Sequence, residues 1–187
     1  MDVYELFSAI TTLIPSITVL YYSVFNYATI GCLVHAPFSF MYHIKNSWDN
    51  NNVKHVKYPT NNLVYYKLDT SFILVHSFLA GVYLNGVLNV FDLVYMVLNI
   101  LVIIRFKRKN NIIPILIGFG VIRNSFSMVY YSVYYFVLAY TFWALGFVVH
   151  YFDIGGRLNP TLFHLILCIP EYSIIKTSLI IESSKIN

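Results

Sequence analysis

Residues 35–44, HAPFSFMYHI, place three side chains with metal-binding or proton-transfer chemistry at steps of four residues. In a helix, residues four apart lie on one face, so His35, Ser39 and His43 are predicted to form one line. Imidazole nitrogens bind zinc and move protons, and a serine hydroxyl donates hydrogen bonds. The stretch therefore predicts a chemically active helix face in an otherwise apolar chain.

The composition indicates an integral membrane protein. Of the 187 residues, 58% are hydrophobic and only 11% are charged, which does not fit a water-soluble domain. A membrane-spanning helix needs about 20 residues, which leaves room for about seven spans, short loops and no separate soluble domain. We expect residues 1–187 to form a single all-α domain, a polytopic bundle of about seven transmembrane helices.

Apolar runs separated by charges, Asn and Gly predict where the seven spans lie. They are expected at about residues 7–24, 27–44, 68–85, 88–104, 112–123, 127–152 and 161–181. The polar stretch at residues 45–62 is expected to be the only long loop. Asp2 and Glu5 stand where a secretory signal would carry basic residues, so the first span is expected to be retained. Cys32 and Cys168 lie inside apolar runs and indicate neither a disulfide framework nor a CxxC metal site.

Lysine and arginine residues predict the orientation, because cytoplasmic loops carry an excess of them. With seven spans, the N-terminus and the loops after spans two, four and six share one side. That side carries Lys45, Lys54, Lys57, Lys67, Arg105, Lys107, Arg108, Lys109 and Arg157, whereas the other carries Arg123 and Lys185. We expect a cytosolic N-terminus and a luminal or extracellular C-terminus. Basic residues beside spans face anionic lipid, so the net charge of +4 does not indicate nucleic-acid binding.

Ionisable side chains from four helices are expected at one depth near the cytosolic side. His43 ends span two, Asp69 lies in the first turn of span three, His150 ends span six and His164 lies one turn into span seven. Ser39 lies one turn from His43. Ionisable groups inside a bilayer are costly and mark functional sites. Three imidazoles with a carboxylate and a hydroxyl have the make-up of a catalytic zinc site.

These residues resemble the motifs of the CREST superfamily of seven-helix membrane hydrolases, which includes alkaline ceramidases, progestin and adipoQ receptors and lipases that remodel GPI anchors. The resemblance rests on Ser39 and His43 as SxxxH in span two, Asp69 opening span three, and His164 followed by Tyr172 in span seven. It extends over about residues 30–180, and the aromatic stretch from Trp143 to Asp153 is similar to the ceramidase branch. The resemblance implies a seven-helix fold and a zinc ion held by three histidines.

One position departs from the family pattern. If His164 is the second histidine of the HxxxH motif in the last span, Pro160 stands where the first is expected. Three interpretations are open: His150 replaces the missing ligand, Asp69 completes a two-histidine site, or the site is degenerate and binds metal poorly. In another register His164 is the first ligand and Cys168 the second, since a thiolate also binds zinc. We expect His150 to be the third ligand.

The resemblance implies a zinc-dependent lipid hydrolase that cleaves a ceramide-like amide of a sphingolipid, or a lipid ester, near the cytosolic headgroups. Asp69 would take a proton and return it to the leaving group, and Ser39 would donate to the developing oxyanion or orient the water. The alternative is a non-catalytic seven-helix relative with a degenerate metal site, acting as a receptor or in membrane remodelling, which Pro160 favours. The tyrosine-rich sixth span either lines an acyl pocket or packs against lipid.

His35, His76 and Lys176 are further ionisable residues within the spans. His35 and His76 are expected to be core residues or residues that form hydrogen bonds between helices. Lys176 in the seventh span and Asp69 in the third have the crude layout of a retinal Schiff base and its counter-ion. By the depth count Lys176 lies far below Asp69, which disfavours a chromophore.

Overall fold

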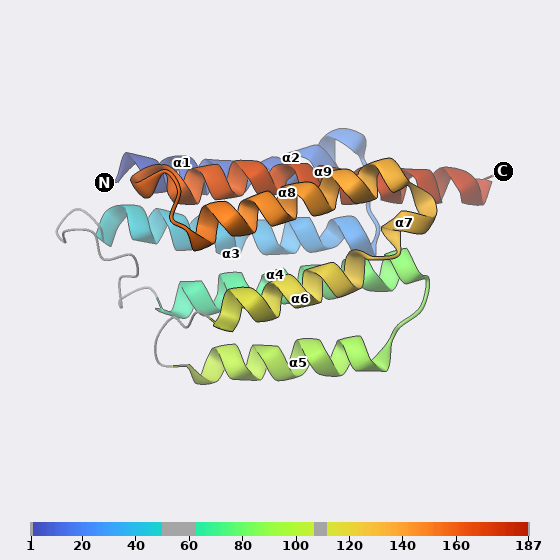
Figure 1. Ribbon diagram of the computed structural model, residues 1–187, viewed down its shortest axis with the longest axis horizontal. Helices are drawn as coiled ribbons and strands as arrows, with labels where there is room; N and C mark the ends of the chain where they lie inside the picture. Colours follow the sequence, from blue (N-terminus) through green and yellow to red (C-terminus); the bar gives the residue numbers. More distant parts are fainter. Residues whose placement is uncertain (1, 50–62, 107–111, 187) are drawn as a thin grey trace.

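The computed structural model describes residues 2–49, 63–106 and 112–186, which are almost entirely helical (Figure 1). The helices are α1 (Val3–Thr11), α2 (Ile14–Tyr22), α3 (Tyr27–Asp49), α4 (Leu63–Asn85), α5 (Val90–Arg105), α6 (Ile112–Ser125), α7 (Met128–Tyr131), α8 (Val133–Tyr151), the 3-10 helix η3 (Gly156–Leu158) and α9 (Asn159–Ile186). No strand occurs in these three ranges. The prediction of an all-α chain is confirmed.

The helices form seven segments, and two of the expected apolar runs contain a break. The first run bends after Thr11, because Pro15 at the start of α2 lacks the N–H that would continue the helix. The expected sixth run, residues 127–152, is interrupted at Ser132. That residue has an extended backbone, and its side chain accepts a hydrogen bond from the N–H of Tyr135 at 3.3 Å, which caps the start of α8.

Helix α3 continues to Asp49, into the stretch expected to be a loop, and α4 begins at Leu63, before the expected start of the third span near residue 68. The polar end of α3 is held by the N-terminal segment. The backbone N–H of Asp2 donates to the carbonyl oxygen of Ser47 at 2.7 Å, and Ser47 Oγ donates to the carbonyl oxygen of Asp2 at 3.0 Å. Hydropathy marks where apolar residues stop, whereas backbone hydrogen bonds decide where a helix stops.

Helices α3 and α4 lie side by side in the middle of the molecule. In Figure 1, α9, α8 and the α1–α2 segment lie on one side of α3, α6 overlaps α4, and α5 lies on the far side of α4. Helix α3 contacts α1, α2, α4 and α9, and α4 also contacts α5 and α6. The two termini lie at opposite ends of the bundle (Figure 1).

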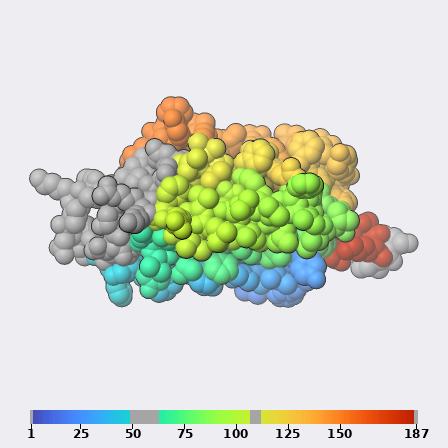
Figure 2. Space-filling model, turned by 90° about the horizontal axis from the view of Figure 1, so that it is seen from below, coloured from blue at the N-terminus to red at the C-terminus, as the bar shows by residue number. Residues whose placement is uncertain are grey.

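Four segments are long and apolar enough to cross a membrane: Val3–Tyr22, Ile112–Tyr131, Val133–Tyr151 and Gly156–Lys185. Of the other described segments, α5 has 16 residues, short of the roughly 20 that a span needs. Helices α3 and α4 have 23 residues each and carry buried polar side chains. Helix α5 lies on the outside of the bundle (Figure 2) and exposes apolar side chains such as Val94, Leu98 and Leu101. A surface of this kind is suited to contact with lipid or another protein.

Helices α3 and α4 approach each other closely at Gly31. A Cβ atom added to Gly31 would lie 2.5 Å from Cδ2 of His76 and 2.9 Å from its Cα. Two turns further along α3, the rings of Phe38 and Phe72 stack with their centroids 4.0 Å apart. Because the His76 backbone cannot move away without separating the two helices, this position requires glycine.

Gly31→Ala is expected to lower the free energy of unfolding by about 1–3 kcal/mol, because the added methyl group overpacks the contact between α3 and α4. The measurement is thermal or denaturant unfolding of the detergent-purified protein, followed by circular dichroism. Gly118→Ala is the matched control, since a Cβ at Gly118 meets nothing within 4 Å and alanine is the better helix former. Equal stability of Gly31→Ala and the wild type would contradict the packing described here.

Candidate functional site

Helix α3 carries the line of polar residues that its sequence predicts. His35, Ser39 and His43 lie at successive turns; Ser39 is fully buried, His43 is 5% exposed and His35 is half-buried. Polar groups buried among apolar helices are costly unless they are paired. The partners of these three side chains therefore define the site.

His43 lies between a carboxylate and a second imidazole. Its Nδ1 is 2.8 Å from Oε2 of Glu5 in α1, and its Nε2 is 2.7 Å from Nε2 of His164 in α9. When Nδ1 donates to the carboxylate, the Nε2 lone pair of His43 faces His164. Helices α1, α3 and α9 thus meet at this imidazole.

Glu5 is a site residue that the sequence does not predict, because it lies in the acidic N-terminal stretch before the first expected span. Helix α1 begins and α3 ends at the same end of the bundle, so a carboxylate in the first turn of α1 reaches the level of His43. Carboxylates that accept from the second ring nitrogen are the usual partners of metal-binding histidines. The one signal for Glu5 in the sequence is that it is an acidic residue near the membrane depth expected for His43 and His164.

Asp69 pairs with His35. Its Oδ1 lies 2.9 Å from Nε2 of His35, and Asp69 is only 6% exposed. His35 is two turns from His43 on α3. Asp69 is therefore bonded two turns away from His43, whereas the sequence predicts it at the level of His43. Asp69 remains within electrostatic range of His43 and His164. The predicted role of His35 in hydrogen bonding between helices is confirmed.

Ser39 lies between the two pairs, one turn from His35 and one turn from His43. Its Oγ is buried and has no hydrogen-bond partner among the described residues. A buried hydroxyl without a partner costs about 1–3 kcal/mol relative to a satisfied one. The orphaned hydroxyl is therefore free to bond a ligand at this position.

His150 lies near His164 without completing a compact group of three ligands. Its ring centroid is 5.0 Å from that of Phe163, and it is within electrostatic range of His164. In the described part of the chain, the ligand atoms of His43, His150 and His164 do not all lie within 4.8 Å of one another. His150 as the third ligand stays a prediction.

The other proposed third ligands have partners of their own. Asp69 is bonded to His35, and Cys168 Sγ lies 3.2 Å from the carbonyl oxygen of His164. Pro160 is the second residue of α9, where a missing N–H is tolerated and the fixed φ favours helix initiation. The residue that departs from the family motif thus has a structural role in starting the helix.

The two facing imidazoles fit two positions of a zinc site after a small adjustment. Two nitrogens bound to a tetrahedral zinc at about 2.0–2.1 Å lie about 3.3 Å apart. The Nε2 atoms of His43 and His164 are 2.7 Å apart. A shift of about half an ångström would admit the ion, and Glu5 already orients the ring of His43.

A second group of ligand-type side chains, Cys32, His76 and Glu171, is not predicted by the sequence. They come from α3, α4 and α9, and their ligand atoms all lie within 4.8 Å of one another. No motif spacing connects them, so only the packing of the helices reveals the group. The contact of His76 Nε2 with Cys32 Sγ at 3.4 Å confirms the expected role of His76 in contacts between helices.

Lys176 lies against aromatic rings. Its ammonium nitrogen is 3.9 Å from the ring centroid of Tyr22 and 5.5 Å from that of Tyr172, which are cation–π contacts. Asp69 is bonded to His35. These contacts agree with the argument against a Schiff base and counter-ion.

Comparisons with known proteins give no match: no family model, no curated protein and no solved structure matches this chain. The assignment of function therefore rests on the geometry of the site and on the motif residues themselves.

The pairing of Asp69 with His35 predicts a measurable coupling energy. In a double-mutant cycle with His35→Ala and Asp69→Ala, the two substitutions should be non-additive by roughly 1–2 kcal/mol, because the bond is a partly buried hydrogen bond to a charged group. The measurement is the free energy of unfolding in mixed detergent micelles. A cycle of Asp69→Ala with His43→Ala is the control and should show a smaller coupling. A larger coupling to His43 would contradict the observed pairing.

Proposed function

We propose that this protein is a seven-pass membrane hydrolase that holds zinc between His43 and His164 and cleaves a lipid amide or ester near the cytosolic headgroups. The observation that carries the proposal is the convergence of these two imidazoles, with Nε2 atoms 2.7 Å apart, and the carboxylate of Glu5 at 2.8 Å from the other nitrogen of His43. Carboxylate-oriented histidines are typical of metal sites. The resemblance to the CREST superfamily, and to its ceramidases, agrees with this function.

Two features support the seven-pass topology. The seven segments follow one another along the chain, and the termini lie at opposite ends of the bundle (Figure 1), as an odd number of crossings requires. The basic residues next to the N-terminal end are Lys45, Lys67, Arg105 and Arg157, and those next to the other end are Arg123 and Lys185. Lys54, Lys57, Lys107, Arg108 and Lys109 lie outside the described residues. This excess supports a cytosolic N-terminus and a luminal or extracellular C-terminus.

The residues around the imidazole pair have separate roles in the proposed reaction. When bound there, zinc supplies a nucleophilic water at neutral pH. Asp69, held by His35, accepts a proton and returns it to the leaving group. Ser39 donates its unpaired hydroxyl to the carbonyl oxygen of the scissile bond as negative charge develops on it. His150, beside His164, is the proposed third ligand.

The position of the site favours a lipid substrate. The site lies at the end of the bundle that carries most basic residues, which is the level of anionic headgroups. On α8, Tyr135, Tyr140 and Trp143 pack against the buried core, whereas Tyr134 and Tyr151 are exposed. We propose that the first three side chains line an acyl chain inside the bundle, and the exposed pair agrees with packing against lipid. A ceramide-like sphingolipid amide is the first substrate to test.

Removal of either facing imidazole should remove both metal and activity. In His43→Ala and His164→Ala, the zinc content of the detergent-purified protein should fall by about one ion per chain, because each variant lacks a ligand. Release of fatty acid from a ceramide-like amide or a lipid ester should fall at least about 100-fold. His150→Ala should behave in the same way if His150 is the third ligand. His55→Ala is the histidine control, since His55 belongs to the polar stretch at residues 45–62.

Two results would point away from this proposal. Unchanged zinc content in both imidazole variants would show that the pair holds no zinc. A normal zinc content without hydrolysis of any lipid amide or ester would favour the non-catalytic alternative, a seven-helix receptor or membrane-remodelling protein. The observation that favours this alternative is Pro160 at the expected ligand position.

Glu5→Gln should weaken zinc binding about 10–100-fold, because loss of the carboxylate that orients a metal-binding histidine typically has an effect of this size. The measurement is competition with a chelator of known zinc affinity. Asp2→Asn is the matched control, since it removes a charge from the same helix end while asparagine preserves the N-cap that Asp2 provides. Equal affinities of Glu5→Gln and Asp2→Asn would show that Glu5 does not orient a ligand.

A further inference from the structure

Cys32, His76 and Glu171 come together where α3, α4 and α9 meet. Cys32 Sγ lies 3.4 Å from His76 Nε2 and 3.5 Å from Glu171 Oε2, and His76 Nε2 lies 3.4 Å from Glu171 Oε2. The three ligand atoms thus form a nearly equilateral triangle. We infer that this triangle is a binding site for a divalent cation of the zinc class, separate from the His43–His164 pair.

The size of the triangle matches the coordination geometry of zinc. With bonds of about 2.3 Å to sulfur, 2.0–2.1 Å to nitrogen and 2.0–2.2 Å to oxygen, the ligand atoms around a tetrahedral zinc lie about 3.4–3.6 Å apart. The three observed separations of 3.4, 3.5 and 3.4 Å fall at this value. The side chains therefore need almost no movement to admit the ion.

The same spacing is too long for an ordinary hydrogen bond between His76 and Glu171. N–H···O bonds in proteins are about 2.7–3.2 Å long, and the His35–Asp69 and His43–Glu5 pairs are 2.9 and 2.8 Å long. The pair of His76 and Glu171, at 3.4 Å, lies outside this range. A separation of 3.4 Å fits two ligands of the same metal ion better than a direct hydrogen bond between His76 and Glu171.

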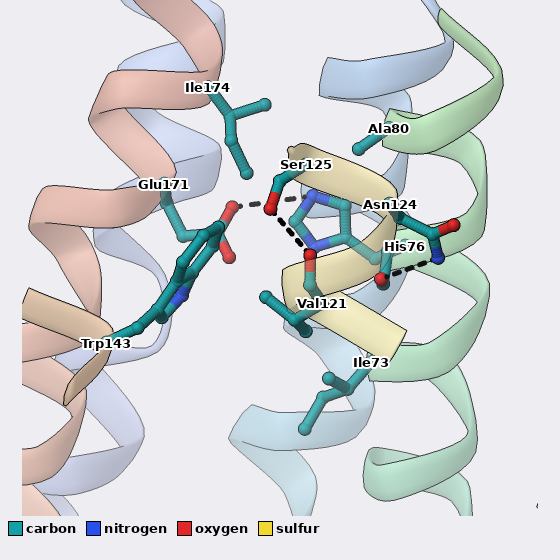
Figure 3. Close-up of a pocket in the computed structure, with 10 residues that line it drawn as sticks. Ile73, His76, Ala80, Val121, Asn124, Ser125, Trp143, Glu171 and Ile174 are labelled. Atoms are coloured by element: carbon teal, nitrogen blue, oxygen red, sulfur yellow. Dashed lines mark hydrogen bonds and ion pairs between the residues drawn. The ribbon is translucent and has the colours of Figure 1, made fainter. Parts of the chain in front are cut away.

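The packing of the bundle positions the three ligands. Cys32 and His76 are buried and Glu171 is half-buried. Figure 3 shows the Glu171 carboxylate from α9 directed toward the His76 imidazole from α4. Gly31, next to Cys32, makes room for this imidazole, since a Cβ there would lie 2.5 Å from Cδ2 of His76. A bound cation would compensate the cost of burying a carboxylate among apolar helices.

A cavity lies beside two of the three ligands, His76 and Glu171. His76 and Glu171 are among the residues that line it, together with Ser125, Trp143 and Ile174 (Figure 3). Zinc sites with three protein ligands keep a fourth position for water or another small ligand, and the cavity provides the space for it. A thiolate and an imidazole select zinc over magnesium or calcium, which prefer oxygen ligands.

This site is distinct from the one that the proposed hydrolase uses. Cys32 precedes His43 by 11 residues on α3, about 16 Å along the helix axis, and Glu171 follows His164 by seven residues on α9, about 10 Å. The inference uses no residue of the CREST motifs and does not depend on hydrolysis. Binding of the ion displaces the thiol proton of Cys32 to solvent, so the site should bind metal more weakly at low pH.

Titration of the metal-free, detergent-purified full chain with cobalt(II) tests the site. Cobalt(II) occupies zinc sites, and its bond to a thiolate produces near-ultraviolet charge-transfer absorption that imidazole and carboxylate ligands do not produce. The wild type should show this band, saturating at one thiolate-bound cobalt per chain, and excess zinc should abolish it. Cys32→Ser should lose the band. Cys168→Ser, which removes the other thiol of the chain, is the matched control and should retain it.

Each outcome decides the inference. A wild type without the band, or a band that persists in Cys32→Ser, would overturn it. His43→Ala separates the two sites, because it should keep the thiolate band while losing the zinc of the proposed hydrolase. A band without lipid hydrolysis would support the second site and reject the proposed function. Loss of zinc in His43→Ala and His164→Ala, in a protein without the band, would support the proposed function and reject the second site.

Discussion

Ionisable side chains can be buried among apolar helices only where each finds a partner, and this constraint ties α3 to its neighbours. His43 reaches Glu5 in α1 and His164 in α9, and His35 reaches Asp69 in α4. The two contacts of His43 join helices that are not neighbours in the sequence, and the His35–Asp69 contact joins two consecutive helices, so the polar pairs specify which helix faces meet. The apolar side chains around them supply packing that is much less selective.

The same constraint explains the division between interior and outer helices. Helices α3 and α4 carry buried polar side chains and fall outside the set of segments that are apolar enough to cross a membrane. The segments with α1–α2, α6 and α9 belong to that set and pack against α3 or α4, and α8 packs against α9. Helix α5 covers the other side of α4 and exposes its apolar face (Figure 2). The polar residues of α3 and α4 lower the hydropathy of each helix taken alone. Within the bundle these polar groups are bonded to partners on neighbouring helices, so they cost less than the hydropathy indicates.

Polar groups recur along the axis of α3, and the neighbouring helices divide them into two centres. Near the end of α3 lies the imidazole pair of His43 and His164 with Glu5, and three turns earlier lies the triangle around Cys32. Between them lie the orphaned Ser39 hydroxyl and the His35–Asp69 pair. Both centres use α3 and α9, so the contact between these two helices determines the geometry of each. The two proposed metal sites therefore share a scaffold while using different ligands.

The sequence by itself determined the approximate positions of most helical segments and the line of His35, Ser39 and His43 on one helix, because apolar runs and a four-residue spacing are local properties of the chain. It also placed His43 and His164 at the same end of the bundle. Only the tertiary structure decided that Asp69 bonds His35, that Glu5 holds His43, and that Cys32, His76 and Glu171 meet. An error of one residue in the position of a helix turns a side chain by about 100° and shifts it by about 1.5 Å. Hydropathy does not determine the rotation and axial position of a helix this closely, whereas close packing between α3 and α4 at Gly31 does.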